Sequence, residues 1–274
     1  MVGKYEVRYR IEILDRQTDK ARLAEALAVY SRSTSAGIRT RTNEILSKIC
    51  HPETAKGQLL FLSLHKGRSI VGFALLAYFQ KNQTIVIDHL AIDEEHRKHG
   101  SFYVFSSLIQ QLILEKYPEY DYVVAEIPID KQFSYDGVNG NALVRLLRSV
   151  GFKRAQVKYR LPNIDARIYK KTYDAALMIR GAHHLSEPRS EDLIELVRVI
   201  MFDFYSDWYK DFLAADFVSY ERHLNELFKQ FKTSLNGRAS VLLNGSHSFS
   251  HPLSGSPVGW LRRVLLSVCR AKRT

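Results

Sequence analysis

The sequence predicts an α/β fold, in which helices pack on a mixed β-sheet. Two observations support this prediction. Short apolar runs with the two-residue period of strands alternate with stretches of helical period, and turn-forming residues separate them. The chain has 274 residues, of which 46% are hydrophobic and 25% charged, the composition of a globular protein with a substantial core. Elements in this order build a sheet that is covered by helices.

A strand and two helices open the predicted order. From Tyr5 to Ile13 apolar and charged residues alternate, which is the period of a half-buried strand. Thr18 is the candidate N-cap of a helix whose apolar stripe begins at Leu23. A second helical stretch covers residues 38–49 and ends before Pro52, since the residue before a proline disfavours helix.

Three strands and a further alternation of helices and strands complete the predicted domain. The apolar runs 59–64 and 70–79 predict a hairpin, and a third strand, 84–92, follows a short polar turn. The remaining predicted elements are a helix over 100–116, a strand over 122–127, a helix over 141–150, and strands over 152–161 and 167–179. Gly151 follows the second helix, where a left-handed cap is expected.

The sequence beyond this domain divides into two further parts. Residues 186–233 carry apolar stripes at helical spacing and predict a helical hairpin, which packs on the main sheet or on a second copy of the chain. Residues 233–257 are rich in Ser, Gly, Asn and His, which predicts a flexible linker, and a short basic amphipathic tail follows from Val258. We therefore expect a domain over 1–180, a helical extension over 186–233 and a tail over 234–274.

The net charge of +11 is typical of proteins that bind an anionic ligand, a nucleic acid or a membrane surface. More than half of this charge lies after Asn236, so it says little about the folded domain. Charges interrupt every apolar run near the N-terminus, and no window reaches the roughly 18 apolar residues of a spanning helix. The cysteines, Cys50 and Cys269, match no metal or disulfide spacing. We expect a cytoplasmic protein without a metal.

The stretch from Asp88 to Phe102 has the composition of an anion site. A strand ends here in a turn that contains Arg97, Lys98 and His99, and Gly100 then opens a helix. The first turn of a helix has unpaired backbone N–H groups and a partial positive charge. A pyrophosphate fits such a site, because glycine lets the backbone approach the ligand closely.

This stretch resembles the signature of the GNAT acetyltransferase superfamily, in which a Leu-x-Val strand is followed by Arg-x-x-Gly-x-Gly/Ala. The residues that match in spacing are Leu90, Ile92, Arg97 and Gly100. The segments that resemble neighbouring elements of the family are 70–75, 125–127 and 149–152. The resemblance covers about residues 1–180 and implies a GNAT-like acyl-CoA N-acyltransferase fold, here with a C-terminal helical extension.

The resemblance implies that the donor is acetyl-coenzyme A and that an amine acceptor attacks its thioester directly. It places the pantetheine arm along the strand at Leu90 and the pyrophosphate on the loop that follows Arg97. It also implies a gap between strands near Leu90 and Glu126, where the thioester enters. The residues assigned to the donor in this way are Leu90, Ala91, Ile92, Arg97, Lys98, His99, Gly100, Ser101 and Phe102. Phe102 replaces the small residue of the family, so its ring either crowds the phosphates or turns aside.

The candidate general bases are Asp88, His89 and Glu126, because these ionisable residues lie nearest the expected gap. Each also has a structural interpretation. In these interpretations, Asp88 caps a neighbouring loop, His89 is a hydrogen-bonded sheet residue, and Glu126 pairs with Arg145.

The general acid is left open by the sequence. Leu147 stands where the family often has a tyrosine that protonates the departing thiolate. The acid is then Tyr135 or Tyr103, or no acid is needed, because thiols have a pKa of about 8.5.

Three functions are consistent with these observations. The first is an N-acetyltransferase that acts on an unidentified amine of a small molecule or protein. The second is a GNAT-fold module that binds coenzyme A but regulates or tethers, which Leu147 favours. The third is a nucleic-acid-associated protein that uses its basic tail, although we expect the tail to contact neither nucleic acid nor membrane. The extension also offers a surface for a homodimer.

Overall fold

The computed structural model describes residues 9–34, 39–97, 100–129, 134–135, 138–162, 172–182 and 188–244. Its main sheet has nine strands in the order β1-β2-β3-β4-β5-β10-β8-β11, with β9 also paired to β10. The strands are β1 (Tyr9–Leu14), β2 (Gln58–Lys66), β3 (Ser69–Phe79), β4 (Thr84–Ile92), β5 (Tyr122–Pro128), β8 (Lys153–Ala155), β9 (Tyr159–Pro162), β10 (Thr172–Gly181) and β11 (Leu243–Asn244). A separate two-stranded ladder joins β6 (Ser134–Tyr135) to β7 (Val138–Asn139).

The sheet is mixed, as predicted. The neighbours β4 and β5 are parallel, with helix α4 (Ser101–Lys116) between them in sequence, and every other pair of neighbours along the sheet is antiparallel. A parallel pair needs such a crossover, because the chain must return to the same end of the sheet before it enters the next strand.

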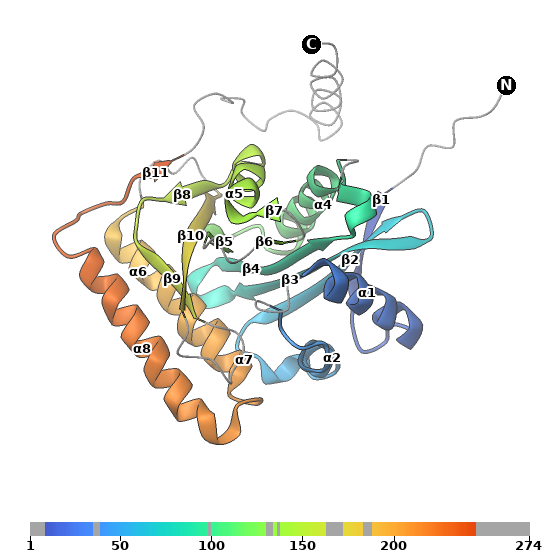
Figure 1. Ribbon diagram of the computed structural model, residues 1–274, viewed down its shortest axis with the longest axis horizontal. Coiled ribbons are helices and arrows are strands. Elements are labelled where there is room, and N and C mark those ends of the chain that lie inside the picture. Colours follow the sequence, from blue (N-terminus) through green and yellow to red (C-terminus); the bar gives the residue numbers. More distant parts are fainter. Residues whose placement is uncertain are drawn as a thin grey trace, which may run out of the picture.

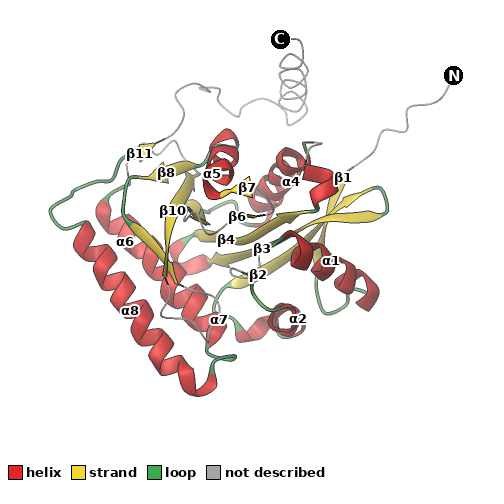
Figure 2. Cartoon of the chain, viewed as in Figure 1, coloured by secondary structure: helices red, strands yellow, loops and turns green. Residues whose placement is uncertain are grey.

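Helices cover both faces of the sheet (Figures 1 and 2). The remaining helices are α1 (Lys20–Ser33), α2 (Thr42–Cys50), α3 (Glu94–Arg97), α5 (Gly140–Ser149), α6 (Ser190–Arg198), α7 (Asp207–Tyr209) and α8 (Phe217–Ser234), with a π-helical segment, η5 (Val199–Ser206). Short 3-10 turns are η2 (Pro52–Thr54), η3 (Gln80–Asn82) and η6 (Ala214–Asp216). Within the described ranges, no helix has the length and apolar character needed to cross a membrane.

Two apolar cores lie on opposite faces of the sheet. One core joins α4 and α5 to side chains such as Leu76, Val123 and Met178. The other joins α1, α2 and the C-terminal helices to side chains such as Phe73 and Leu177. The helical extension therefore buries its apolar stripes on the sheet of its own chain. The predicted homodimer is not needed to cover them and stays a prediction.

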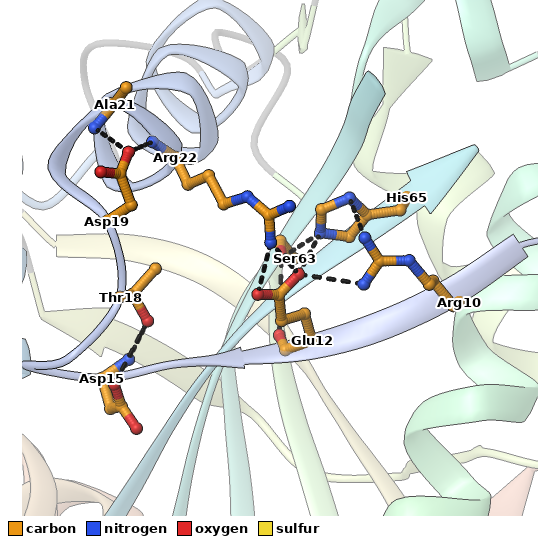
Figure 3. Close-up of polar contacts among 9 residues, drawn as sticks. All are labelled: Arg10, Glu12, Asp15, Thr18, Asp19, Ala21, Arg22, Ser63 and His65. Atoms are coloured by element: carbon orange, nitrogen blue, oxygen red, sulfur yellow. Dashed lines mark hydrogen bonds and ion pairs between the residues drawn. The ribbon is translucent and has the colours of Figure 1, made fainter. Parts of the chain in front are cut away.

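The structure differs from the predicted elements in three places. Asp19, not Thr18, caps α1, since its carboxylate accepts the amides of Ala21 (2.8 Å) and Arg22 (3.3 Å) (Figure 3). The strand predicted over 152–161 is broken, because β8 and β9 both pair with β10 on either side of residues 156–158. The segment predicted as a linker contributes β11, which pairs with β8. Residues 245–274, including the basic tail, lie outside the described residues.

A polar cluster joins β1 to β2 and α1 (Figure 3). The Glu12 carboxylate accepts hydrogen bonds from Arg22 (2.8 and 3.0 Å) and Arg10 (3.0 Å). It also lies 3.1 Å from Nε2 of the buried His65, which contacts the Ser63 hydroxyl at 2.9 Å. One ring nitrogen of His65 meets both groups and the other faces Arg10. The cluster therefore fixes an edge strand and is not arranged as a proton relay.

A buried lysine fastens the extension to α2. Lys48 is 1% exposed, and its ammonium donates to Asp211 (2.6 Å) and to Thr54 (3.1 Å). The same nitrogen lies 5.9 Å from the ring centre of Trp208 and 5.6 Å from that of Phe212. Hydrogen bonds and cation–π contacts of a desolvated cation are among the stronger polar interactions in proteins.

We expect Lys48→Met to lower the free energy of unfolding by about 2 kcal/mol, because it removes charge-assisted hydrogen bonds while it keeps the apolar stem. Lys56→Met is the matched control, because the Lys56 side chain is 56% exposed and its ammonium lies 3.6 Å from the Asp203 carboxylate. An exposed pair contributes less than about 1 kcal/mol. Denaturant unfolding of both variants measures the difference, and equal losses would contradict the role of Lys48.

Candidate active site

The parallel strands β4 and β5 separate at one point. They pair from Thr84 and Tyr122 up to Ile87 and Ala125. Beyond these residues β4 stays with β3 as far as Ile92, and β5 stays with β10. The two strands therefore diverge, and a gap opens with main-chain groups of β4 on one side and of β5 on the other.

A β-bulge shapes the β4 side of this gap. His89 is the register partner of Leu75, and Ile87 that of Leu76, so Asp88 is an extra residue without a partner on β3. Neighbouring residues of a regular strand point to opposite faces, whereas a bulge re-aims them. At this bulge the Asp88 carboxylate and Nε2 of His89 meet at 3.1 Å, on the face that α1 and the extension cover.

Asp88 and His89 are both deeply buried. Nε2 of His89 contacts the hydroxyls of Tyr30 (2.9 Å) and Thr40 (3.1 Å), as the structural interpretation of this histidine predicts. Burial lowers the pKa of His89 to about 3 and raises the pKa of Asp88 to about 7. Both shifts have the same cause, because burial disfavours the charged form of each group. His89 is therefore a neutral, weakly basic sheet residue.

Glu126 lies across the gap, one residue beyond the last β4–β5 pair. Its carboxylate accepts hydrogen bonds from Tyr159 on β9 and from Tyr205 on η5, the latter at 2.6 Å. These hydroxyls take the place of the expected partner, Arg145. Burial raises the pKa of Glu126 to about 7, while the tyrosine hydrogen bonds lower it and the nearby Asp88 raises it further.

A groove lies on the opposite face, between α4 and α5. About 450 Å³ of atom-free space lies here, open solvent included. The residues that line it include Ile87, Leu90, Ser106, Ile109, Gln110, Ile113, Leu147 and Val150. Ile87 and Leu90 flank the point where the strands separate, so the groove reaches the gap. Its walls are mainly apolar, and Leu147 contributes no proton donor to it.

The loop before α4 keeps Gly100 in the left-handed region, with φ of 74°. The amides of Tyr103 and Val104 both bond back to the Gly100 carbonyl. The helix has no side-chain N-cap, so the amides of Ser101 and Phe102 open the helix without one. The Phe102 ring packs on the apolar core of this face.

Other predicted site residues have different roles or lie outside the described part. The Arg97 guanidinium donates to the carbonyls of Ile92 (2.9 Å) and Ser33 (3.5 Å), so it holds the loop against the end of β4. The Ser101 hydroxyl donates to the His96 carbonyl at 3.0 Å. Lys98 and His99 lie outside the described residues, as does the side chain of Tyr135. The Tyr103 hydroxyl lies 3.5 Å from Ser149 on α5.

Sequence reasoning missed Tyr159 and Tyr205, the partners of Glu126. Tyr159 falls in a strand that was predicted as continuous, although its alternation with Leu161 marks it as inward-facing. Tyr205 lies off the predicted helical stripe of Ile200, Phe204 and Trp208, and the π-helical turn brings it inward as well. Among the described residues no group of His, Cys, Asp and Glu is arranged to hold a metal ion.

Comparison with known proteins shows which proteins share this architecture. Residues 3–131 match a family profile described as an acetyltransferase (GNAT) domain. A GNAT-family protein from Bacteroides thetaiotaomicron is 11% identical, covers 71% of this chain and 98% of its own, and has a TM-score of 0.52. This similarity shows a shared fold. A search of curated proteins gives no match.

Two further solved structures are similar at lower TM-scores. The ribosomal-protein-S18-alanine N-acetyltransferase of Escherichia coli is 15% identical, with coverage of 65% of this chain and 96% of its own and a TM-score of 0.45. The protein yncA of Salmonella typhimurium, solved with its cofactor acetyl-CoA, is 15% identical, with coverage of 67% and 99% and a TM-score of 0.43.

The raised pKa of Glu126 predicts a pH-dependent stability. Between its ordinary value of 4.5 and about 7, the folded protein holds a proton that the unfolded chain releases. Raising the pH through this window therefore lowers the free energy of unfolding. We expect Glu126→Gln to remove this loss, so that the variant gains about 2 kcal/mol relative to the wild type from pH 4.5 to 7.

Denaturant unfolding across this pH range measures the effect. Glu195→Gln is the control, because the Glu195 side chain is 48% exposed. A wild type and a Glu126→Gln variant with parallel pH dependence would contradict the buried, protonated carboxyl.

Proposed function

Because the chain belongs to the GNAT acetyltransferase superfamily, we propose that it is an N-acetyltransferase that transfers an acetyl group from acetyl-coenzyme A to an amine. One observation carries this proposal. The separation of β4 from β5 joins an apolar groove on one face of the sheet to paired carboxyl groups on the other. A donor and an acceptor that approach from opposite faces meet at this gap.

The donor fits the groove and the strand edge. Beyond Ile87, the edge of β4 that faces the gap has no β5 partner, so an extended pantetheine arm adds there like a strand. The groove between α4 and α5 provides apolar walls for the arm. The amides of Ser101 and Phe102, at the uncapped start of α4, face the diphosphate that the superfamily places on this loop.

Glu126 is the general base in this proposal. An alkylammonium must lose a proton before its nitrogen attacks, and a base with a pKa near the working pH accepts that proton best. Glu126, with a pKa of about 7, meets this condition, whereas His89, with a pKa of about 3, does not. Asp88 has a similar pKa, but Nε2 of His89 already lies 3.1 Å from its carboxylate.

Two protons leave the nitrogen in this reaction. Glu126 takes the first from the ammonium and releases it to solvent. The amine nitrogen then forms a bond to the acetyl carbon while the carbon–sulfur bond breaks, and the second proton passes to the Glu126 carboxylate, directly or through water. The sulfur leaves as a thiolate, which takes a proton from solvent. No acid is required from Leu147, because a thiol has a pKa of about 8.5 and its anion is a moderate leaving group.

A second candidate function is a coenzyme A binding module without catalysis. Leu147 favours this function, since α5 supplies no hydroxyl to the groove. Both Glu126 oxygens are also engaged by tyrosines, as they would be in a purely structural network. In either function, we propose that residues 1–180 bind the donor, and that residues 186–233 form an extension packed on this domain.

Thiol release from acetyl-coenzyme A, measured with a panel of primary amines, tests the proposal. We expect kcat/KM to rise with pH through about 7, because Glu126 must be ionised to accept the proton. Glu126→Gln should lower kcat/KM by about 100-fold or more above pH 7, within the range typical of general bases, and should abolish the rise with pH. Glu195→Gln should leave it unchanged.

The outcomes separate the candidates. A chain that acetyl-coenzyme A stabilises against heat, but that releases no thiol with any amine, is a binding module. Full activity of Glu126→Gln would show that another group is the base. A chain that acetyl-coenzyme A does not stabilise at millimolar concentration would exclude both candidates.

A further inference from the structure

The helical extension supplies a side chain to the candidate base. Tyr205, on the π-helical segment η5, donates its hydroxyl to one Glu126 oxygen at 2.6 Å, and Tyr159 on β9 donates to the other oxygen. Both tyrosines are 3% exposed. The two hydroxyls come from separate elements, β9 and η5, and meet at one carboxylate.

We propose that Tyr205 and Tyr159 are positioning residues that orient and tune the Glu126 carboxylate, so that the helical extension is a required part of the active site. This inference rests on the proposed function, in which Glu126 is the base. It goes further, because it assigns a catalytic purpose to a segment outside the region that the family profile matches, residues 3–131.

The geometry suits this purpose. A carboxylate that accepts one hydroxyl at each oxygen can no longer rotate freely, so its remaining lone pairs have fixed directions. Burial, together with the nearby Glu126, raises the pKa of both tyrosine hydroxyls well above the usual value, so they stay protonated and act only as donors.

The hydrogen bonds from the two tyrosines also influence the pH at which Glu126 is ionised. Burial raises the pKa of Glu126, and the bonds from Tyr159 and Tyr205 oppose this by stabilising the anion. Among the residues that the structure describes, the other titratable groups that face Glu126 are Asp88 on β4, which disfavours its ionisation, and Tyr220 on α8. Loss of either tyrosine donor should therefore raise the pKa of Glu126.

Two polar contacts hold the helical extension in the position that brings the Tyr205 hydroxyl to Glu126. Asp207, two residues further on and 3% exposed, accepts the Lys56 amide at 2.7 Å. Lys48 bonds to Asp211 at 2.6 Å in the next turn. Both anchors tie the segment around Tyr205 to α2 and to the chain that follows α2.

Tyr205→Phe tests the proposal, with Tyr159→Phe as the second variant in case the first fails to fold. Tyr220→Phe is the matched control. Its ring is 1% exposed on the same extension, but its hydroxyl has no hydrogen-bond partner within the described chain. Infrared titration follows the carboxyl band that is present in the wild type and absent from Glu126→Gln, and it needs no substrate.

We expect the midpoint of this band to rise by about one pH unit in Tyr205→Phe and in Tyr159→Phe, because a hydrogen bond to a charged group is worth about 1.5 kcal/mol. It should stay in place in Tyr220→Phe. If the pKa of Glu126 rises by one unit, thiol release with an amine from the panel should be about five-fold slower at pH 7. Near pH 9 the carboxyl is ionised in the variant as well, so the rate should return to that of the wild type. A merely structural tyrosine would lower activity equally at every pH.

Unshifted midpoints in both tyrosine variants would overturn the proposal, as would a loss of activity that high pH does not restore. The infrared result stands apart from the reaction. If Glu126→Gln keeps full activity, the assigned base is wrong and the tyrosines position no catalytic group. If Glu126→Gln is inactive and the tyrosine variants keep wild-type pH profiles, Glu126 remains the base and only the positioning role fails.

Discussion

The separation of two parallel strands is the constraint on which the rest of the site depends. β4 and β5 share a register only from Thr84 to Ile87, after which each follows its other neighbour. The bulge at Asp88 lies at the point of divergence, where an extra residue bends a strand and increases its twist. Main-chain groups that a continuous sheet would have paired are left facing a gap, and buried carboxyls stand at its rim. The same divergence connects two faces that a closed sheet would keep apart.

Burial and hydrogen bonding shift the pKa of Glu126, at the rim of this gap, in opposite directions. Burial raises the pKa of Asp88 and of Glu126 to about 7, and for Glu126 two tyrosine donors limit the rise. His89 is uncharged, because burial lowers the pKa of its imidazole to about 3. The imidazole contacts the hydroxyls of Tyr30 and Thr40 and the Asp88 carboxyl. The result is a carboxyl that can change protonation near neutral pH. A fully solvated glutamate would already be ionised and would accept a proton less readily.

The sequence predicts the elements that carry the gap. The periodicity of apolar residues predicts strand 84–92, and Gly100 marks the start of the helix that follows. An apolar run that ends at Pro128 predicts the strand that contains Glu126. The contacts of Tyr159 and Tyr205 with Glu126 could not be predicted, although the alternation of Tyr159 with Leu161 marks Tyr159 as inward-facing. Tyr205 lies in a π-helical segment, which departs from the 3.6-residue period on which helix patterns rest. The role of Arg97 was also hidden, since nothing in a sequence shows that a guanidinium bonds to the carbonyl of Ile92.

A crystal structure of the chain with coenzyme A tests the central claim most directly. We predict that the sulfur lies in the gap between Leu90 and Glu126, that the pantetheine arm runs along β4 between α4 and α5, and that the diphosphate meets the amides after Gly100. A sulfur far from the point where β4 and β5 diverge would contradict the account. So would a complex in which these strands stay paired beyond Ile87 and Ala125.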